Sequence, residues 1–266
     1  MSEHIDMKIS GASTMPGGEY GTVSISGAGK VQGHLKCEEL RCSGASKILG
    51  DVDCSGEIHT SGATKAAGSV HCGSLSSSGA FSAEAALQVQ TLASVSGSLQ
   101  AAGAVSADEL RASGSLDAGS VHCRTFQSSG CCKIAGDLEA ETVVLTGAAT
   151  IAGLLNAETV SITPNRAIEI GAIGGSRIQI LRHSAGFFLH DLLPSSIQRA
   201  RIDSIEGDEI DLEYVEAQIV RGRNVRIGQG CRIGCVEYTE SLHADAGTVE
   251  KSMQTGKEST ALSEEL

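Results

Sequence analysis

Cysteine is the residue type in this chain with the widest choice of chemistry. Three of the nine cysteines, Cys37, Cys54 and Cys72, recur at nearly equal intervals. Thiols brought together in this way could form disulfides or bind a soft metal, but a small thiol also fills a narrow core, and we predict core packing. Cys231 and Cys235 have a CxxxC spacing with no second Cys or His pair nearby, so we predict no zinc site and no other cofactor.

Histidines and carboxylates are the other groups that could act as acids, bases or ligands. His71 and His122 each precede a cysteine in an alternating segment, which turns them outward. One acidic string could suggest a cation site, although we favour a solvated face; it consists of Glu206, Asp208, Glu209, Asp211 and Glu213. The sequence contains no P-loop, nucleophile elbow or dinucleotide fingerprint. These patterns predict a protein that is not an enzyme and binds no nucleotide.

A Ser/Thr-Gly pair recurs at a nearly constant interval through the first half of the chain. The elements between these pairs must position the cysteines and histidines named above that lie in that half. The glycines of the pairs are Gly11, Gly27, Gly44, Gly62, Gly79, Gly97, Gly114, Gly130 and Gly147. A fixed period of about 17 residues indicates one structural unit copied along an axis. We expect glycine at each corner because it adopts positive φ and lets successive units approach closely.

Within each unit, apolar and polar residues alternate with the period of a half-buried strand. Two inward columns follow from this alternation. The first is Leu35, Val52, Val70, Leu87, Val105, Val121, Leu138 and Leu155, and the second is Cys37, Cys54, Cys72, Val89, Ala107, Cys123, Ala140 and Ala157. Units of about 17 residues with about three short strands each predict an all-β fold, a parallel β-helix whose coils stack about 4.8 Å apart.

Composition and charge narrow the possible functions. The 266 residues include no Trp and 33 Gly, which suit a thin core with many tight corners. The net charge of -12 argues against nucleic acid as a partner, since phosphate binding needs a basic surface. The chain begins MSEHIDMKIS, which lacks the features of a signal peptide, and no apolar run approaches the length of a membrane span. We therefore expect a cytoplasmic protein with reduced thiols.

The repeat divides the chain into four predicted parts. Residues 1–20 are an N-terminal lead-in or tail, and residues 21–163 form the regular β-helix. Past about Pro164 the rhythm changes, and residues 164–238 form a second, less regular β-helical segment. Residues 239–266 are predicted to be a polar, disordered C-terminal tail.

An apolar excursion at residues 181–198 interrupts the second segment. It contains Phe187, Phe188, Leu189, Leu192 and Leu193. A clustered apolar stretch in a chain with 3% aromatic residues must be buried against something. We predict contact with a partner or a membrane surface; the alternative is that the stretch folds back over a flank of the tube or over the junction between the two segments.

Serial coils of the form S-G-x-x-x-I-x-G-x-L-x-A, followed by SIEGDEIDLE, IVRGRNV and IGQGCRIGCVEY, resemble the bactofilin family of polymer-forming cytoskeletal proteins. The resemblance covers about residues 10–238 and points to the longer two-part members of Gram-positive bacteria. It implies a right-handed β-helix that assembles end to end into filaments without nucleotide. It also implies a scaffolding role in the bacterial cytoplasm, often near the membrane surface or a membrane-bound protein.

Open ends are the expected assembly surfaces of such a β-helix, because each end exposes unpaired N–H and C=O groups above an apolar cross-section. We predict polymer contacts at Val23 and Ile25, in or near the first coil, and at Val236 and Tyr238, in the last coil. The main partner is then a second copy of the chain.

The alternative function is that of a left-handed β-helix acyltransferase of the hexapeptide type. Ile227-Gly228 and Ile233-Gly234 have the spacing of a hexapeptide repeat. However, most intervals between the repeating glycines are not multiples of six. We therefore favour the structural scaffold over the enzyme.

Overall fold

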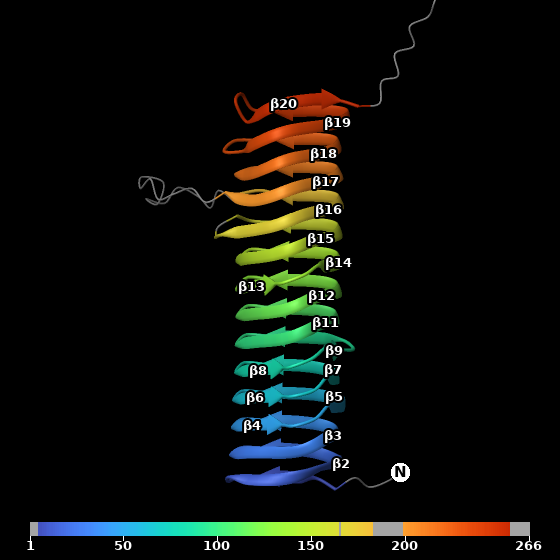
Figure 1. Ribbon diagram of the computed structural model, residues 1–266, viewed down its shortest axis with the longest axis vertical. Helices are drawn as coiled ribbons and strands as arrows, with labels where there is room; N and C mark the ends of the chain where they lie inside the picture. The colour runs from blue at the N-terminus through green and yellow to red at the C-terminus, as the bar shows by residue number, and fades with distance from the viewer. Residues whose placement is uncertain (1–4, 165, 183–198, 256–266) are drawn as a thin grey trace, which may run out of the picture.

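The computed structural model describes residues 5–164, 166–182 and 199–255. In these ranges all regular secondary structure is β-strand. The strands form one 20-stranded parallel sheet that winds into about 14 stacked coils (Figure 1). The all-β, β-helical fold predicted from the repeat is confirmed. Its right-handed sense stays an implication of the resemblance.

The strands follow one another along the axis, from the N-terminal end of the tube to the C-terminal end (Figure 1). In chain order they are β1 (Met7–Ile9), β2 (Ser13–Ile25), β3 (Ala28–Cys42), β4 (Ala45–Ile48), β5 (Val52–Thr60), β6 (Ala63–Ala66), β7 (Val70–Ser77), β8 (Ala80–Ala83), β9 (Leu87–Val89), β10 (Leu92–Val95), β11 (Ser98–Ala112), β12 (Ser115–Ser128), β13 (Cys131–Ile134), β14 (Leu138–Leu145), β15 (Ala148–Ile162), β16 (Ile168–Ile180), β17 (Ala200–Leu212), β18 (Val215–Ile227), β19 (Arg232–Ala244) and β20 (Val249–Gln254).

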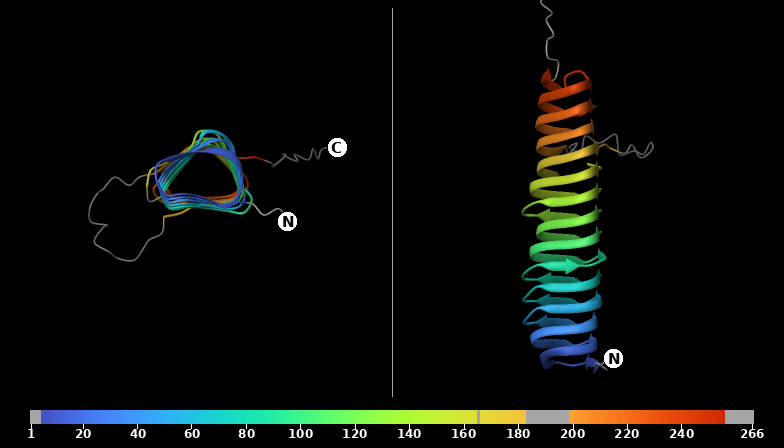
Figure 2. Two further views of the ribbon diagram at one scale, coloured as in Figure 1. Left: turned by 90° about the horizontal axis from the view of Figure 1, so that it is seen from below. Right: turned by 90° about the vertical axis from the view of Figure 1, so that its right-hand side faces the viewer.

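Seen along its axis the tube is a triangle (Figure 2), so each coil contributes one segment to each of three faces. We call them face A, face B and face C, represented in one coil by residues 28–31, 35–37 and 40–42. Equivalent residues of successive coils are register partners, as in Leu35↔Val52 and Val52↔Val70. Because neighbouring strands lie about 4.8 Å apart, each inward position becomes a continuous column along the tube.

The interior of the tube is a single apolar core. Both columns predicted from the sequence point inward; of their members, Ala107 and Ala140 are only partly buried. Leu35, Val52 and Val70 are each at most 1% exposed. Burying one such side chain contributes about 1.5–3 kcal/mol, and the contacts join neighbouring coils, so stability accumulates from coil to coil.

A few inward side chains are polar, and three of them, Ser46, Thr60 and Thr64, hydrogen-bond to one another. Ser46 Oγ donates to Thr64 Oγ1 at 2.9 Å, and the hydroxyl oxygens of Thr60 and Thr64 lie 3.0 Å apart. All three side chains are buried. Mutual hydrogen bonding offsets the cost of removing these hydroxyls from water. The alternation of the sequence predicts that these positions face inward, but not that they pair.

Close packing between coils explains the repeating glycines, whereas positive φ, the other predicted cause, does not. None of the nine Ser/Thr-Gly glycines has a positive φ, so that part of the prediction is wrong. Close approach explains them instead: a Cβ on Gly114 would overlap the carbonyl oxygen of Gly97 in the preceding coil. The same oxygen accepts a hydrogen bond from Ser115 N at 2.8 Å. Glycine is required because the backbone of one coil occupies the space that a side chain of the next would need.

The solenoid extends beyond the predicted boundaries and is more uniform than they suggest. Residues 7–20, predicted as lead-in, contain β1 and the first part of β2, and residues 239–254, predicted as tail, contain the end of β19 and all of β20. Strands on both sides of Pro164 belong to one sheet, and β17 and β18 keep one unbroken register from Ala200↔Val215 to Leu212↔Ile227. The predicted boundaries are wrong because outward polar side chains dominate the terminal coils and resemble a tail in composition.

Candidate assembly surfaces

Within the described residues, the N-terminal end of the tube is an open sheet edge. β1 pairs with β2 in parallel register, with Met7 opposite Val23 and Ile9 opposite Ile25, and it has no second partner among the described residues. Met15 of β2 is partly buried against the core on face A of the same end. An unpaired edge offers backbone donors and acceptors to another strand.

The C-terminal end of the described structure is open in the same way. β20 continues faces A and B of the last coil, with Val249 opposite Ile233 and Gln254 opposite Tyr238. Face C ends in β19, where Leu242 lies opposite Val225 of β18 and meets no further described strand. Leu242 and Val249 are partly buried, so this end also combines an unpaired backbone with apolar side chains.

The four predicted polymer contacts lie one coil inside these ends. Val23, Ile25 and Val236 are at most 1% exposed, and Tyr238 is partly buried opposite β20. None of them can meet another chain unless β1 or β20 is displaced, so their assignment as end contacts is wrong. The error follows from treating β1 and β20 as parts of tails. The segments MKI at 7–9 and LHA at 242–244 alternate apolar and polar residues in phase with the inward columns. This alternation identifies the true ends of the tube in the sequence.

Gly11 distinguishes the first coil from all later ones. It belongs to the Ser-Gly pair of the first coil, and no described atom lies within 4 Å of a Cβ placed on it. At each of the eight later glycines of the series, a Cβ would instead collide with the backbone of the preceding coil. The space that those coils fill is therefore open at Gly11 within the described structure.

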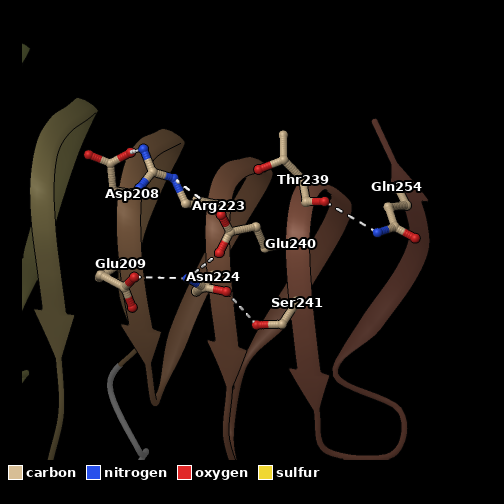
Figure 3. Close-up of polar contacts among 8 residues, drawn as sticks. All are labelled: Asp208, Glu209, Arg223, Asn224, Thr239, Glu240, Ser241 and Gln254. Carbon is tan, nitrogen blue, oxygen red and sulfur yellow. Dashed lines mark hydrogen bonds and ion pairs between the residues drawn. The ribbon is translucent and has the colours of Figure 1, made fainter. Parts of the chain in front are cut away.

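Charged and amide side chains of β17, β18 and β19 form polar contacts between neighbouring coils (Figure 3). Arg223 lies between two acidic side chains, with Nη2 3.0 Å from Asp208 Oδ1 and Nε 3.9 Å from Glu240 Oε1. Asn224 Nδ2 donates to Glu209 Oε1 at 2.9 Å and to Glu240 Oε2 at 3.2 Å. Asp208 and Glu209 of the acidic string thus pair with a basic and an amide side chain of the next coil. No described group of three His, Cys, Asp or Glu residues could hold a metal ion.

The cysteine column is built into the core of face B. Cys37, Cys54 and Cys72 are register partners, at most 3% exposed, and are free thiols. Burial raises the pKa of Cys72 to about 12. A hydrogen bond with Cys54, together with burial, raises the pKa of Cys37, and the same hydrogen bond lowers the pKa of Cys54. A thiol held neutral by burial is a poor nucleophile and ligand, which supports the packing interpretation for Cys37 and Cys72.

The remaining candidate ligands do not converge. Cys231 is buried and its Sγ lies 3.4 Å from the carbonyl oxygen of Leu212, whereas Cys235 is half-buried. His71 and His122 point outward and are exposed, as predicted. His122 Nδ1 lies 3.2 Å from Glu139 Oε2 of the next coil.

The residues predicted to contact a partner or a membrane lie outside the described residues. They are Phe187, Phe188, Leu189, Leu192 and Leu193. Their role stays a prediction. In the part of the chain that the structure describes, no helix has the length and apolar character needed to cross a membrane.

Comparisons with known proteins do not assign the chain to a family. No protein-family model matches it, and no solved structure matches it. Uncharacterized protein YhbF of Bacillus subtilis (strain 168) is 39% identical over 79 residues, which are 29% of this chain and 30% of the relative. Uncharacterized protein YhbE of the same organism is 36% identical over 81 residues, 30% of this chain and 33% of the relative. The chain therefore spans about a third of the length of these relatives.

Proposed function

We propose that this chain is a structural scaffold that assembles end to end into filaments without nucleotide, as the resemblance to bactofilins implies. The open space at Gly11 is the observation that carries the proposal. At later corners glycine is required only because another coil precedes it. Glycine at position 11 is required for the same reason if a coil of a second chain packs against it.

The two ends are suited to each other in strand direction and in apolar character. When the C-terminal coil of one chain lies on the N-terminal coil of another, the sheet continues as a parallel ladder. If the columns of the chain continue across the junction, Leu242 stacks on Met7 and Val249 stacks on Met15. Met15, Leu242 and Val249 are only partly buried in the single chain, so their further burial and the pairing of the edge strands both favour association.

The proposal includes no catalytic step and no cofactor. It places the filament in the bacterial cytoplasm, with the chain itself as the main partner. Contact with a membrane surface or a membrane-bound protein is assigned to the apolar stretch at residues 181–198.

Electron microscopy and light scattering of the full chain, in buffer without nucleotide or metal, test the assembly. We expect filaments from the unaltered chain. Met15→Lys and Val249→Lys each place a charge on one end and should each abolish filaments. Both side chains are only partly buried, so the fold should survive, which circular dichroism melting verifies.

Leu154→Lys is the matched control, because Leu154 is an apolar residue on the side of the tube that is 41% exposed. It should leave filament formation unchanged. The proposal is refuted if the unaltered chain remains monomeric at high concentration, or if both end variants assemble as the control does.

A further inference from the structure

Face A of the N-terminal coils carries a row of like charges. Lys30, Lys47 and Lys65 occupy the same outward position in three successive coils, where Lys30 lies opposite Lys47 and Lys47 opposite Lys65. The strand spacing sets their Cα atoms about 4.8 Å apart along the axis. We call these three residues the lysine ladder.

Elsewhere on the tube, basic side chains lie next to acidic ones in a neighbouring coil. Such pairs are Lys36–Glu19, Arg124–Asp108, Arg201–Glu169, Arg221–Glu237 and Arg223–Asp208. Like charges directly opposite each other in a sheet are destabilising. The lysine ladder therefore lowers the stability of the fold, whereas the ion pairs named above place opposite charges next to each other. A binding function would explain why the lysine ladder is present.

The lysine ladder is only partly neutralised within the chain. Lys65 Nζ lies 2.7 Å from Glu84 Oε1. Lys30 and Lys47 form no ion pair with any residue in the described ranges. Glu84 also attracts the Lys47 ammonium group at longer range, but Lys30 and Lys47 remain available to an anionic ligand, in a protein whose net charge is -12.

A groove of about 470 Å³ runs beside the lysine ladder. Its lining includes one column of small outward residues, Ala28, Ala45, Ala63, Ala80 and Ser98, together with the three lysines. This column crosses five coils, so the groove is about 19 Å long. That length holds about six residues of an extended peptide, which rises about 3.3 Å per residue.

We propose that the lysine ladder and the adjacent groove bind an extended acidic peptide segment of a protein partner. Alternate side chains of an extended peptide point to the same side about 6.7 Å apart. Flexible lysine side chains at intervals of about 4.8 Å can meet carboxylates at that separation. Small side chains of the peptide would then lie along the alanine column.

The shape and chemistry of the groove favour a peptide over other anions. A bilayer is flat, so it would touch the lysines without filling the groove. Single-stranded nucleic acid binds on exposed aromatic rings. Phe81 lines the groove but is 2% exposed because it faces the core, so it offers no ring for stacking.

Fluorescence anisotropy with a labelled short peptide of alternating Glu and Ala, long enough to span the groove, tests the proposal. The protein is the full chain with Met15→Lys, so that binding is measured apart from assembly. We expect binding that weakens as salt is added, and no binding of the matched Gln–Ala peptide. Adding Lys30→Ser, Lys47→Ser and Lys65→Ser together should weaken binding at least tenfold, whereas Glu84→Gln should strengthen it.

Lys133→Ser is the matched control, because Lys133 occupies the same column of face A but lies opposite Asp117, away from the groove. It should leave binding unchanged. Circular dichroism melting verifies that each variant is folded. The proposal is overturned if the Glu–Ala peptide does not bind, or if the triple serine variant binds it as well as the control does. It is also overturned if anionic phospholipid vesicles or a single-stranded oligonucleotide bind through the lysine ladder and the peptide does not.

Discussion

Replacing a corner glycine by alanine in the middle of the tube and at its N-terminal end tests two different roles of glycine. In Gly114→Ala, the new Cβ would overlap the carbonyl oxygen of Gly97 and force the two coils apart. The hydrogen bonds at risk are those from Ser115 N to Gly97 O, at 2.8 Å, and from Gly114 N to Val95 O, at 3.3 Å. In Gly11→Ala, the new Cβ meets no described atom.

These contacts set the expected magnitudes. A backbone hydrogen bond contributes about 1 kcal/mol net, and a donor or acceptor left unpaired away from water costs about 1–3 kcal/mol. Gly114→Ala should therefore lower the free energy of unfolding by about 2–4 kcal/mol. Gly11→Ala should change it by less than about 1 kcal/mol, because alanine also restricts the unfolded chain.

Urea denaturation of the dilute protein measures the free energy of unfolding, and light scattering of the concentrated protein measures assembly. Gly11→Ala should keep the stability of the unaltered chain and yet assemble poorly, since a preceding chain would collide with the new methyl group. Normal assembly of Gly11→Ala would refute a coil of another chain at that corner. Unchanged stability of Gly114→Ala would refute the close-approach explanation of the repeat.

Cys54→Ala should lower the melting temperature by only a few degrees, whereas Cys54→Arg should abolish cooperative melting by burying an unpaired charge; equal tolerance of both, by circular dichroism, would contradict the inward placement. Burial raises the pKa of Cys72 and of Cys123 to about 12 from an ordinary value of 9.0. As pH rises, the unfolded chain therefore loses these protons before the folded chain does, so the free energy of unfolding should fall between about pH 9 and about pH 12. Urea denaturation repeated across that range should show a smaller fall in Cys72→Ala. Lys47→Glu places a carboxylate between two lysines and should raise the melting temperature, while Lys133→Ser, the control, should not.

The repeat made the fold predictable from the sequence alone. Period-2 alternation is a local property, and a fixed interval between Ser/Thr-Gly pairs places equivalent residues such as Leu35, Val52 and Val70 opposite one another. The inward position of the cysteines followed from the same register. Neither inference needed information about distant parts of the chain.

The ends and the lysine ladder were not predicted, for two physical reasons. Short terminal strands such as β1 carry few apolar residues, so the composition around Met7 and Val249 does not distinguish a last coil from a tail. Lys30 and Lys47 form a surface only when the register is known, although the motifs SGAGK and SGASK show the spacing. The sequence does not separate the two causes of a repeating glycine, because close packing between coils and positive φ both select glycine.

Because the rise per coil is constant, the number of coils sets the length of this protein along its axis. About 14 coils at about 4.8 Å correspond to an axial repeat of about 67 Å in an end-to-end filament. Any feature that occurs once per chain, such as the lysine ladder, would recur at that interval along the filament and present bound partners at a regular pitch. Gain or loss of one coil during evolution would change the pitch in steps of about 5 Å without altering the cross-section, so the distance between partners would be encoded in the number of repeats.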